Sequence, residues 1–195
     1  MKSQNTKALV GMGILTAIVV VLQSLASSIR FGPFSITLVL APIVIGAAMY
    51  GWKAGAWLGA VFGIVVVATD AGAFLAISPI GTVCTCVGKG MLAGLASGLV
   101  YQLIEKRNQT AAVITAGIVC PVVNTGVFLL CCLLFFLDSV KEWGAGAGYD
   151  NIGAYFLFAF VGVNFLVELG INMVLSTAIV RILKTVKRPA ASAAA

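Results

Sequence analysis

The chain has 195 residues, of which 61% are hydrophobic and 9% are charged, and its formal net charge is +6. So few charged residues exclude a sizeable soluble domain, because roughly one quarter of the residues in soluble domains are charged. The lysines and arginines lie in short turns and tails beside apolar segments, as membrane topology requires, so they do not indicate a nucleic-acid partner. No alternation of apolar and polar residues recurs over about ten positions, so we predict an all-α integral membrane protein rather than a transmembrane β-barrel.

The apolar segments predict a single domain over residues 1–188, a compact bundle of six transmembrane helices. The expected spans are residues 8–26, 36–50, 54–69, 80–104, 111–137 and 152–180, and Pro42 interrupts the second of them. Residues 24–26 (SLA) imitate a signal-peptide cleavage site, but the apolar run before them is longer than such a peptide needs. Residues 189–195 (PAASAAA) carry no packing signal, and we expect a flexible tail or a remnant of cloning.

The connections between the spans differ in length and charge. Residues 51–53 and 105–108 form tight turns, whereas residues 27–34, 70–78 and 138–151 form longer connections, the second being a loop or a re-entrant segment. Six spans place both termini on one side, with most of the cations: Lys2, Lys7, Lys53, Lys106, Arg107, Arg181, Lys184, Lys187 and Arg188. The positive-inside rule makes that side cytoplasmic. We therefore expect a multi-pass protein of the cell membrane with cytoplasmic termini and mobile outer loops.

Glycine recurs at every fourth residue in two neighbouring segments. The first stripe is Gly51, Gly55, Gly59 and Gly63, and the second is Gly90, Gly94 and Gly98. On a helix this spacing leaves one face without side chains, along which another backbone can approach closely in lipid. We therefore predict that the third and fourth spans pack flank to flank. Gly13 and Ala17 form a single pair of small residues at the same spacing on the first span. A routine packing contact inside the bundle would explain this pair equally well.

Two ionisable residues, Lys89 and Glu168, fall well inside the expected spans. Each costs about 2.5–3.5 kcal/mol at the bilayer centre on the insertion scale, so we expect both to face the interior of the bundle. Two interpretations follow: the residues form an ion pair that stabilises the bundle, or they belong to a binding site.

Polar residues also recur inside the last two spans. Asn164, Glu168 and Asn172 are four residues apart and share one helix face. Together with Asn124 and Thr125, they offer donors and acceptors to a small polar ligand, although asparagine also holds membrane helices together. For Asn172, the nearest of them to the cytoplasm, we favour the structural role.

The sequence lacks the residue combinations of the common enzyme classes. It contains no histidine, so a serine or cysteine nucleophile would have no histidine base. Residues 88–90 (GKG) resemble a phosphate-binding loop, but Val83 and Gly90 stand where that motif requires glycine and Ser/Thr. Cys84 and Cys86 lack the further ligands of a metal site. We expect a protein that is not an enzyme and needs no cofactor or metal.

Several segments carry a combined pattern: residues 34–51 (FSITLVLAPIVIGAAMYG), residues 53–63 with their glycine stripe, the Lys-Gly pair at 89–90, and residues 121–126 (PVVNTG). Together they resemble the substrate-binding S component of energy-coupling factor (ECF) vitamin transporters. The first helix of that family carries Ala-x-x-x-Ala, where this chain has Gly13 and Ala17. Glycine keeps that surface flat.

The resemblance implies a subunit that binds a vitamin tightly near its outer face, beneath the first, third and fifth connections. Its expected partners are the vitamin, membrane lipid, an ECF transmembrane coupling protein and two ATPase subunits that drive uptake. Gly13 and Ala17 would contact the coupling protein, and the S component would topple in the membrane to deliver its ligand.

The residue types narrow the choice of ligand. Arg30 and Lys89 offer cations to a carboxylate, and asparagines suit hydroxyl or amide groups. We therefore expect a small anionic vitamin such as pantothenate, bound by Arg30, Lys89, Asn124, Asn164 and Glu168. Folate, riboflavin and other vitamins are the alternatives, and a cationic vitamin such as thiamine requires Glu168 to be available. The outer connections supply few aromatic residues for stacking: Phe31, Phe34, Phe74, Trp143 and Tyr149.

Two other functions are compatible with the same residues. A structural or partner-binding membrane protein would use the glycine stripes to bind partner helices. A stand-alone secondary transporter would also carry broken helices and interior charges, although no inverted repeat is evident between the halves.

Overall fold

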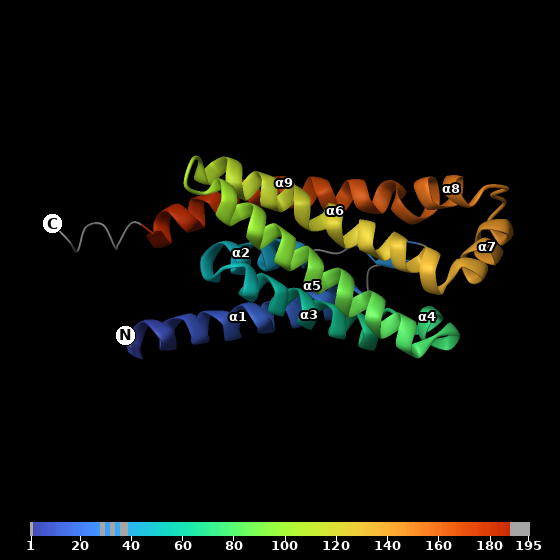
Figure 1. The fold of residues 1–195 in the computed structure, drawn as a ribbon, viewed down its shortest axis with the longest axis horizontal. Helices are drawn as coiled ribbons and strands as arrows, with labels where there is room; N and C mark the ends of the chain where they lie inside the picture. Colours follow the sequence, from blue (N-terminus) through green and yellow to red (C-terminus); the bar gives the residue numbers. More distant parts are fainter. Residues whose placement is uncertain (1, 28–29, 32–33, 36–38, 188–195) are drawn as a thin grey trace.

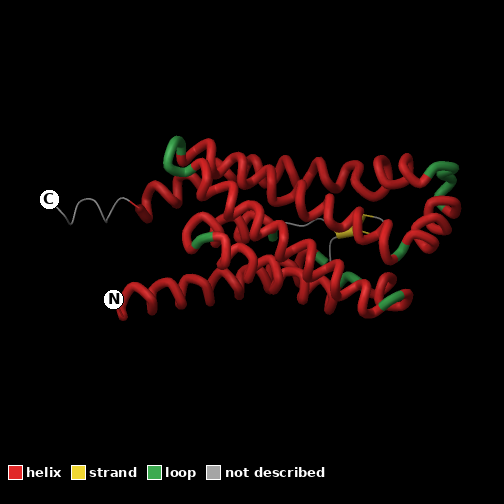
Figure 2. Tube along the Cα trace, viewed as in Figure 1, coloured by secondary structure: helices red, strands yellow, loops and turns green. Residues whose placement is uncertain are grey.

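A computed structural model describes residues 2–27, 30–31, 34–35 and 39–187 (Figures 1 and 2). Within that range the regular structure is helical apart from a short antiparallel hairpin, in which Arg30 pairs with Ser35 and Phe31 with Phe34. The elements in chain order are α1 (Lys2–Ala26), β1 (Arg30–Phe31), β2 (Phe34–Ser35), α2 (Leu40–Tyr50), α3 (Trp52–Thr69), α4 (Gly72–Ile77), α5 (Pro79–Ile104), α6 (Gln109–Phe135), α7 (Leu137–Gly146), α8 (Ile152–Tyr155), the π-helix η1 (Phe156–Gly162) and α9 (Val163–Lys187).

Four helices are long and apolar enough to cross a membrane: the Thr6–Ala26 part of α1, and α3, α5 and α6. α2 and the Phe165–Val180 part of α9 are apolar but shorter. Large apolar side chains on these helices, such as Leu9, Leu103 and Leu134, are exposed, and an extended apolar surface of this kind marks contact with lipid or protein. The chain is therefore an all-α membrane protein, and the number of six spans remains a prediction.

α2 is buried along most of its length. Eight of its 11 residues are buried, and it packs against α1, α3, α5, α6 and α9. The predicted interruption at Pro42 is wrong, because Pro42 lies in the first turn of α2, where the missing N–H has no helical partner to lose. Residues 36–38 of the expected span lie outside the described range. α2 ends at Gly51, whose φ of +92° lets the chain turn at once into α3.

α3 and α5 pack backbone to backbone, as the glycine spacing predicts. A Cβ atom added at Gly55 would overlap the carbonyl group of Gly94, and one added at Gly59 would overlap the carbonyl group of Gly90. This is the most extensive contact between helices in the described chain. It fixes α5, and with it Lys89, against α3.

The third and fifth connections contain helices that the sequence pattern missed. Residues 70–78, predicted as a loop or re-entrant segment, contain α4, and residues 138–151, predicted as a mobile polar segment, contain most of α7. α7 buries Val140 and Gly144 and exposes Asp138 and Lys141, so it is an amphipathic helix that packs on the bundle. The last predicted span is likewise divided into α8, η1 and α9, and α9 continues beyond residue 180.

Polar residues at the ends of the connections begin the next helices. Ser78, Asn108 and Asn151 precede α5, α6 and α8, and the side-chain oxygen of each accepts a hydrogen bond from a backbone N–H of the first turn. Such caps satisfy donors that have no partner inside the helix. They explain why these helices begin where they do.

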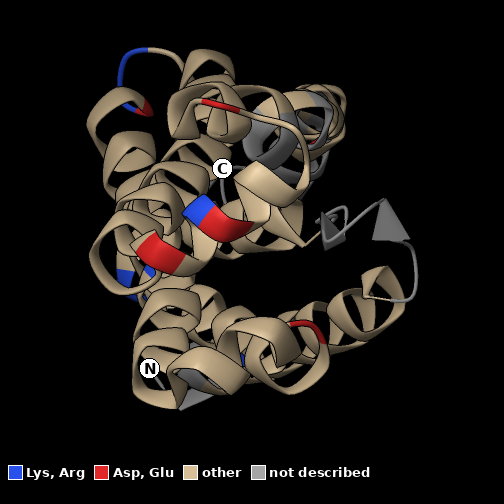
Figure 3. Cartoon of the chain, turned by 90° about the vertical axis from the view of Figure 1, so that its right-hand side faces the viewer, with Lys and Arg blue, Asp and Glu red and all other residues tan. Residues whose placement is uncertain are grey.

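The molecule has two distinct ends (Figure 1). The start of α1 and the end of α9 lie at one end, together with the tight turns from α2 to α3 and from α5 to α6, whereas α4 and α7 lie at the other. Figure 3 looks onto this α4–α7 end and shows acidic residues on the segments nearest the viewer. Both ends of the described chain therefore share a side, as an even number of spans requires, and its assignment to the cytoplasm remains a prediction.

Candidate functional site

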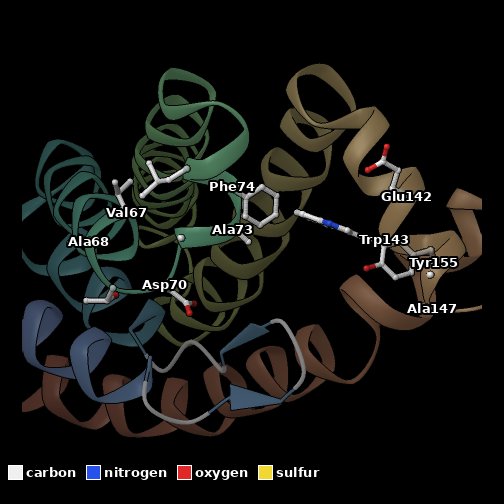
Figure 4. A pocket seen from close by; sticks show the side chains of 13 residues that line it. Val67, Ala68, Asp70, Ala73, Phe74, Glu142, Trp143, Ala147 and Tyr155 are labelled. Atoms are coloured by element: carbon white, nitrogen blue, oxygen red, sulfur yellow. The ribbon is translucent and has the colours of Figure 1, made fainter.

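A cavity of about 790 Å³ opens at the α4–α7 end. It lies between the end of α3, α4, α7 and α8, and Figure 4 shows its lining side chains. Two carboxylates, Asp70 and Glu142, and three aromatic side chains, Phe74, Trp143 and Tyr155, line it. Its volume falls within the usual range for small-molecule sites. The third and fifth connections thus enclose a space large enough for a vitamin.

Phe74 stands at the centre of an aromatic cluster at this cavity. The Phe74 ring makes edge contacts with the rings of Phe128, Phe136 and Trp143, at centroid distances of 5.8, 5.1 and 5.3 Å. Figure 4 shows Phe74 and Trp143 extending toward each other from α4 and α7. None of the six residues of α4 is fully buried, so these ring contacts are an important part of what holds α4 in place.

Lys89 lies on the bundle side of that aromatic cluster. Its Nζ atom lies 4.8 Å from the centroid of the Phe128 ring and 5.8 Å from that of Phe62. These are cation–π distances, and the side chain is half-buried. Lys89 is not among the described residues that line the cavity, but the Phe128 ring beneath its ammonium group contacts Phe74, which does line it.

Asn124 and Glu168 are more deeply buried than Lys89. Asn124 is 5% exposed, and its Oδ1 atom has no hydrogen-bond partner among the described residues. Glu168 on α9 is 4% exposed and lies within electrostatic range of the Cys120 thiol on α6. Both side chains face the bundle interior, which for Glu168 we predicted from the cost of burying a charged group in lipid.

Lys89 and Glu168 do not form an ion pair among the described contacts. The described contacts of the Lys89 Nζ atom are instead the rings of Phe62 and Phe128. The structure therefore does not support the ion-pair interpretation.

The sequence analysis singled out three further polar residues, Asn172, Arg30 and Asn164. The Nδ2 atom of Asn172, which is 2% exposed, donates a hydrogen bond of 2.9 Å to the backbone carbonyl of Glu168, and this bond within α9 agrees with a structural role. Arg30 begins β1 and Asn164 lies in the first turn of α9, but their side chains lie outside the described part of the structure. Their roles as ligand-binding residues remain predictions.

Gly13 and Ala17 face outward from α1. Both are exposed, and a Cβ atom added at Gly13 would meet no atom within 4 Å. The inward face of α1 includes Gly11, beside the Tyr50 ring, and Thr16, whose hydroxyl accepts a hydrogen bond of 3.3 Å from Trp57 Nε1. The small-residue pair is therefore not a packing contact within the described bundle.

The described residues contain no group of three or more Cys, Asp or Glu side chains that could hold a metal ion. Cys84 is exposed and Cys86 is buried, so the two thiols point to different sides of α5. A shared metal ion between them has no geometric support.

Sequence reasoning found part of the cavity. It named Phe74 and Trp143 as aromatic residues of the outer connections, but it missed Tyr155 and gave no role to Asp70 or Glu142. Their positions within or beside two long connections were a usable signal. Only the folding of those connections into α4 and α7 brings the five side chains to one cavity.

Comparisons with known proteins identify what this chain is similar to. The family model described as "ECF transporter, substrate-specific component" matches residues 7–180. The pantothenic acid transporter PanT of Lactococcus lactis subsp. cremoris (strain MG1363) is 29% identical over 199 residues, which cover 92% of this chain and 95% of that protein. No solved structure matches the chain.

Proposed function

The chain belongs to the substrate-specific components of ECF transporters, and we propose that it is the membrane-embedded subunit that binds pantothenate with high affinity for uptake. The family assignment makes it part of a transporter rather than an enzyme. The choice of pantothenate is supported by a relative that is named as a pantothenic acid transporter and is covered almost completely by this chain.

The surroundings of Lys89 are the observation that favours an anionic ligand. A half-buried cation whose described contacts are aromatic rings lacks the full countercharge that a low-dielectric site favours. The carboxylate of pantothenate supplies such a charge. The amide and hydroxyl groups of the same ligand suit the buried side chains of Asn124 and Glu168, and Arg30 and Asn164 complete the proposed set.

The surface of α1 supports the proposal that separate subunits bind this chain and drive uptake. Gly13 and Ala17 form a flat outward patch of the kind on which another membrane helix can pack closely. We assign this patch to an ECF transmembrane coupling protein, which would act with two ATPase subunits. Both ends of the described chain, which lie opposite the cavity, would then face the cytoplasm.

The lining of the cavity favours a second candidate ligand. Asp70 and Glu142 place two carboxylates among aromatic side chains, and the part of the lining that the structure describes includes no lysine or arginine. A cationic aromatic vitamin such as thiamine would match this lining better than an anion does. Under the first proposal the cavity is an entrance, and the carboxylate of the ligand binds beyond it at Lys89.

Isothermal titration calorimetry on the purified protein separates the two ligands. We expect pantothenate to bind and thiamine not to bind. Replacing Lys89 by Met should weaken pantothenate binding by about 1.5–3 kcal/mol, or roughly 10- to 150-fold, because a hydrogen bond to a charged group is lost.

Lys53→Met is the matched control, because Lys53 Nζ also lies over an aromatic ring, that of Trp52 at 5.5 Å, but at the opposite end of the molecule. The control should bind as the parent does. Binding of thiamine instead of pantothenate, or full affinity in the Lys89→Met variant, would contradict the proposal.

A further inference from the structure

A groove lies on the surface of α1, at the end of the molecule opposite the cavity. Its volume is about 580 Å³, and the described part of its lining comes from two turns of that helix: Thr6, Lys7, Val10, Gly11 and Ile14. These positions recur at intervals of three to five residues, so they share one side of the helix. We call this feature the α1 groove. None of its described residues belongs to the proposed vitamin site.

The two ends of the α1 groove differ in chemistry. Val10 and Ile14 are 57% and 56% exposed and present apolar side chains. Lys7, one turn nearer the start of the helix, is exposed as well and makes no ion pair among the described contacts. Gly11 lies between them and faces α2, because a Cβ atom added there would overlap the hydroxyl group of Tyr50. The groove is therefore cationic at one end and apolar along the rest.

The cationic end lies where the surface of a membrane is expected. The part of α1 that is apolar enough to cross a membrane begins at Thr6, one residue before Lys7. Figure 1 shows that the start of α1 extends past the turn from α2 to α3. A lysine at such a position meets lipid headgroups. Val10 and Ile14 lie roughly 4 and 10 Å further along the helix axis, at the depth of the acyl chains.

An anionic phospholipid carries its groups in the matching order, with a phosphodiester at the surface and acyl chains below it. The ammonium group of a lysine donates hydrogen bonds to phosphate oxygens, and basic pockets beside membrane helices bind acidic headgroups. A zwitterionic headgroup fits less well, because its own cation already compensates the phosphate. We propose that the α1 groove binds one anionic phospholipid, with its phosphodiester at Lys7 and one acyl chain along Val10 and Ile14.

The bound lipid would border the flat patch on α1. Ile14 directly follows Gly13 in the helix, and all three residues of the patch edge, Gly13, Ile14 and Ala17, are exposed. The lipid would therefore form one margin of the surface that a partner helix can reach. Its site is independent of the vitamin, which would bind at the other end of the molecule.

Native mass spectrometry of the purified protein tests this lipid site. The protein is exchanged into detergent micelles that contain equal amounts of dioleoylphosphatidylglycerol, which is anionic, and dioleoylphosphatidylcholine, which is zwitterionic and has the same acyl chains. We expect one phosphatidylglycerol to stay bound to each chain, with at least a fivefold preference over phosphatidylcholine, because a lysine near an anionic headgroup contributes about that factor.

Two variants change the two ends of the α1 groove separately. Lys7→Gln removes the charge, so it should lower the retained phosphatidylglycerol roughly tenfold and abolish the preference for it over phosphatidylcholine. Val10→Trp fills the apolar part and should displace both lipids although Lys7 is still present. Both side chains are exposed, so both variants should unfold at the temperature of the parent protein.

Lys53→Gln is the matched control. Lys53 is an exposed lysine at the same end of the molecule, but it lies over the Trp52 ring and is not among the described residues that line the α1 groove. This variant should retain phosphatidylglycerol within about twofold of the parent.

Equal losses in Lys7→Gln and Lys53→Gln would overturn the site, because they would show only a diffuse attraction between acidic lipid and the basic end of the protein. Equal retention of the two lipids by the parent, full retention in Val10→Trp, or displacement of the lipid by glycerol phosphate would overturn it too. Pantothenate binding should be unchanged in Lys7→Gln, so failure of the proposed function and failure of the lipid site are recognised separately.

Discussion

Two helices of this protein carry small residues at the same spacing and use them in opposite ways. On α3, Gly55 and Gly59 are covered by the backbone of α5, so any side chain there would overlap a carbonyl group. On α1, Gly13 and Ala17 are exposed, and a side chain at Gly13 would meet nothing. A four-residue spacing of small residues therefore predicts a close helix contact without saying whether the partner lies in the same chain.

The difference arises from complementarity. α5 presents a second glycine stripe to α3, so both backbones can approach and both surfaces are satisfied within one molecule. The outward face of α1 has no such counterpart in the described chain. Its counterpart is expected on another protein, which agrees with membership of a family whose members work in a multi-subunit transporter.

Filling the closed contact should have the largest effect. Replacing Gly59 by Leu forces α3 away from the carbonyl of Gly90, and such overpacking should destabilise the fold by about 3 kcal/mol or more. Thermal unfolding of the detergent-solubilised protein measures this loss. Gly88→Leu, on α5 where an added Cβ meets nothing within 4 Å, should unfold near the parent temperature. Equal melting temperatures for all three proteins would show that the contact between α3 and α5 is not close-packed.

Filling the open face should affect uptake but not stability. In Gly13→Leu the new side chain would occupy the flat patch on α1, so we expect unchanged thermal unfolding and pantothenate binding, while uptake by the complete transporter falls roughly tenfold or more, equivalent to about 1.4 kcal/mol of docking energy. Uptake of radiolabelled ligand into vesicles measures the effect. Gly170→Leu, at an exposed glycine on α9 with similar free space, should transport normally. A loss of thermal stability in Gly13→Leu would show that the α1 face is packed within the chain after all.

The smallest effect is expected where α1 is joined to α3. The hydrogen bond from Trp57 to Thr16 is a polar contact between these helices, and Trp57→Phe should cost about 0.6 kcal/mol, the average for polar contacts between membrane helices. Thermal unfolding again gives the measurement. The double variant Trp57→Phe with Thr16→Val should be no less stable than the less stable of the two single variants, because both changes remove the same hydrogen bond. Additive losses would mean that the two side chains act independently.

The candidate site was predictable only in part. The cost of burying Lys89 and Glu168 in lipid correctly placed both toward the interior, because that cost depends on the residue type and not on its neighbours. The ion pair, one of the two interpretations that the sequence left open, is not found among the described contacts. The relative depth of two residues on different helices depends on helix tilt and on how the chain enters each helix, and the start of α9 follows the π-helix η1, which alters the helical register.

The sequence by itself determined that the protein is helical and membrane-embedded, that α3 and α5 meet along glycine, and to which family the chain is similar. These properties follow from composition and from spacing along single helices, where neighbours in sequence are neighbours in space. Only the tertiary structure decided that α4 and α7 fold over a shared cavity, that Gly13 and Ala17 remain open, and that Lys89 lies over Phe128 instead of pairing with Glu168. Each of these depends on how separate helices are placed against one another, which no local pattern specifies.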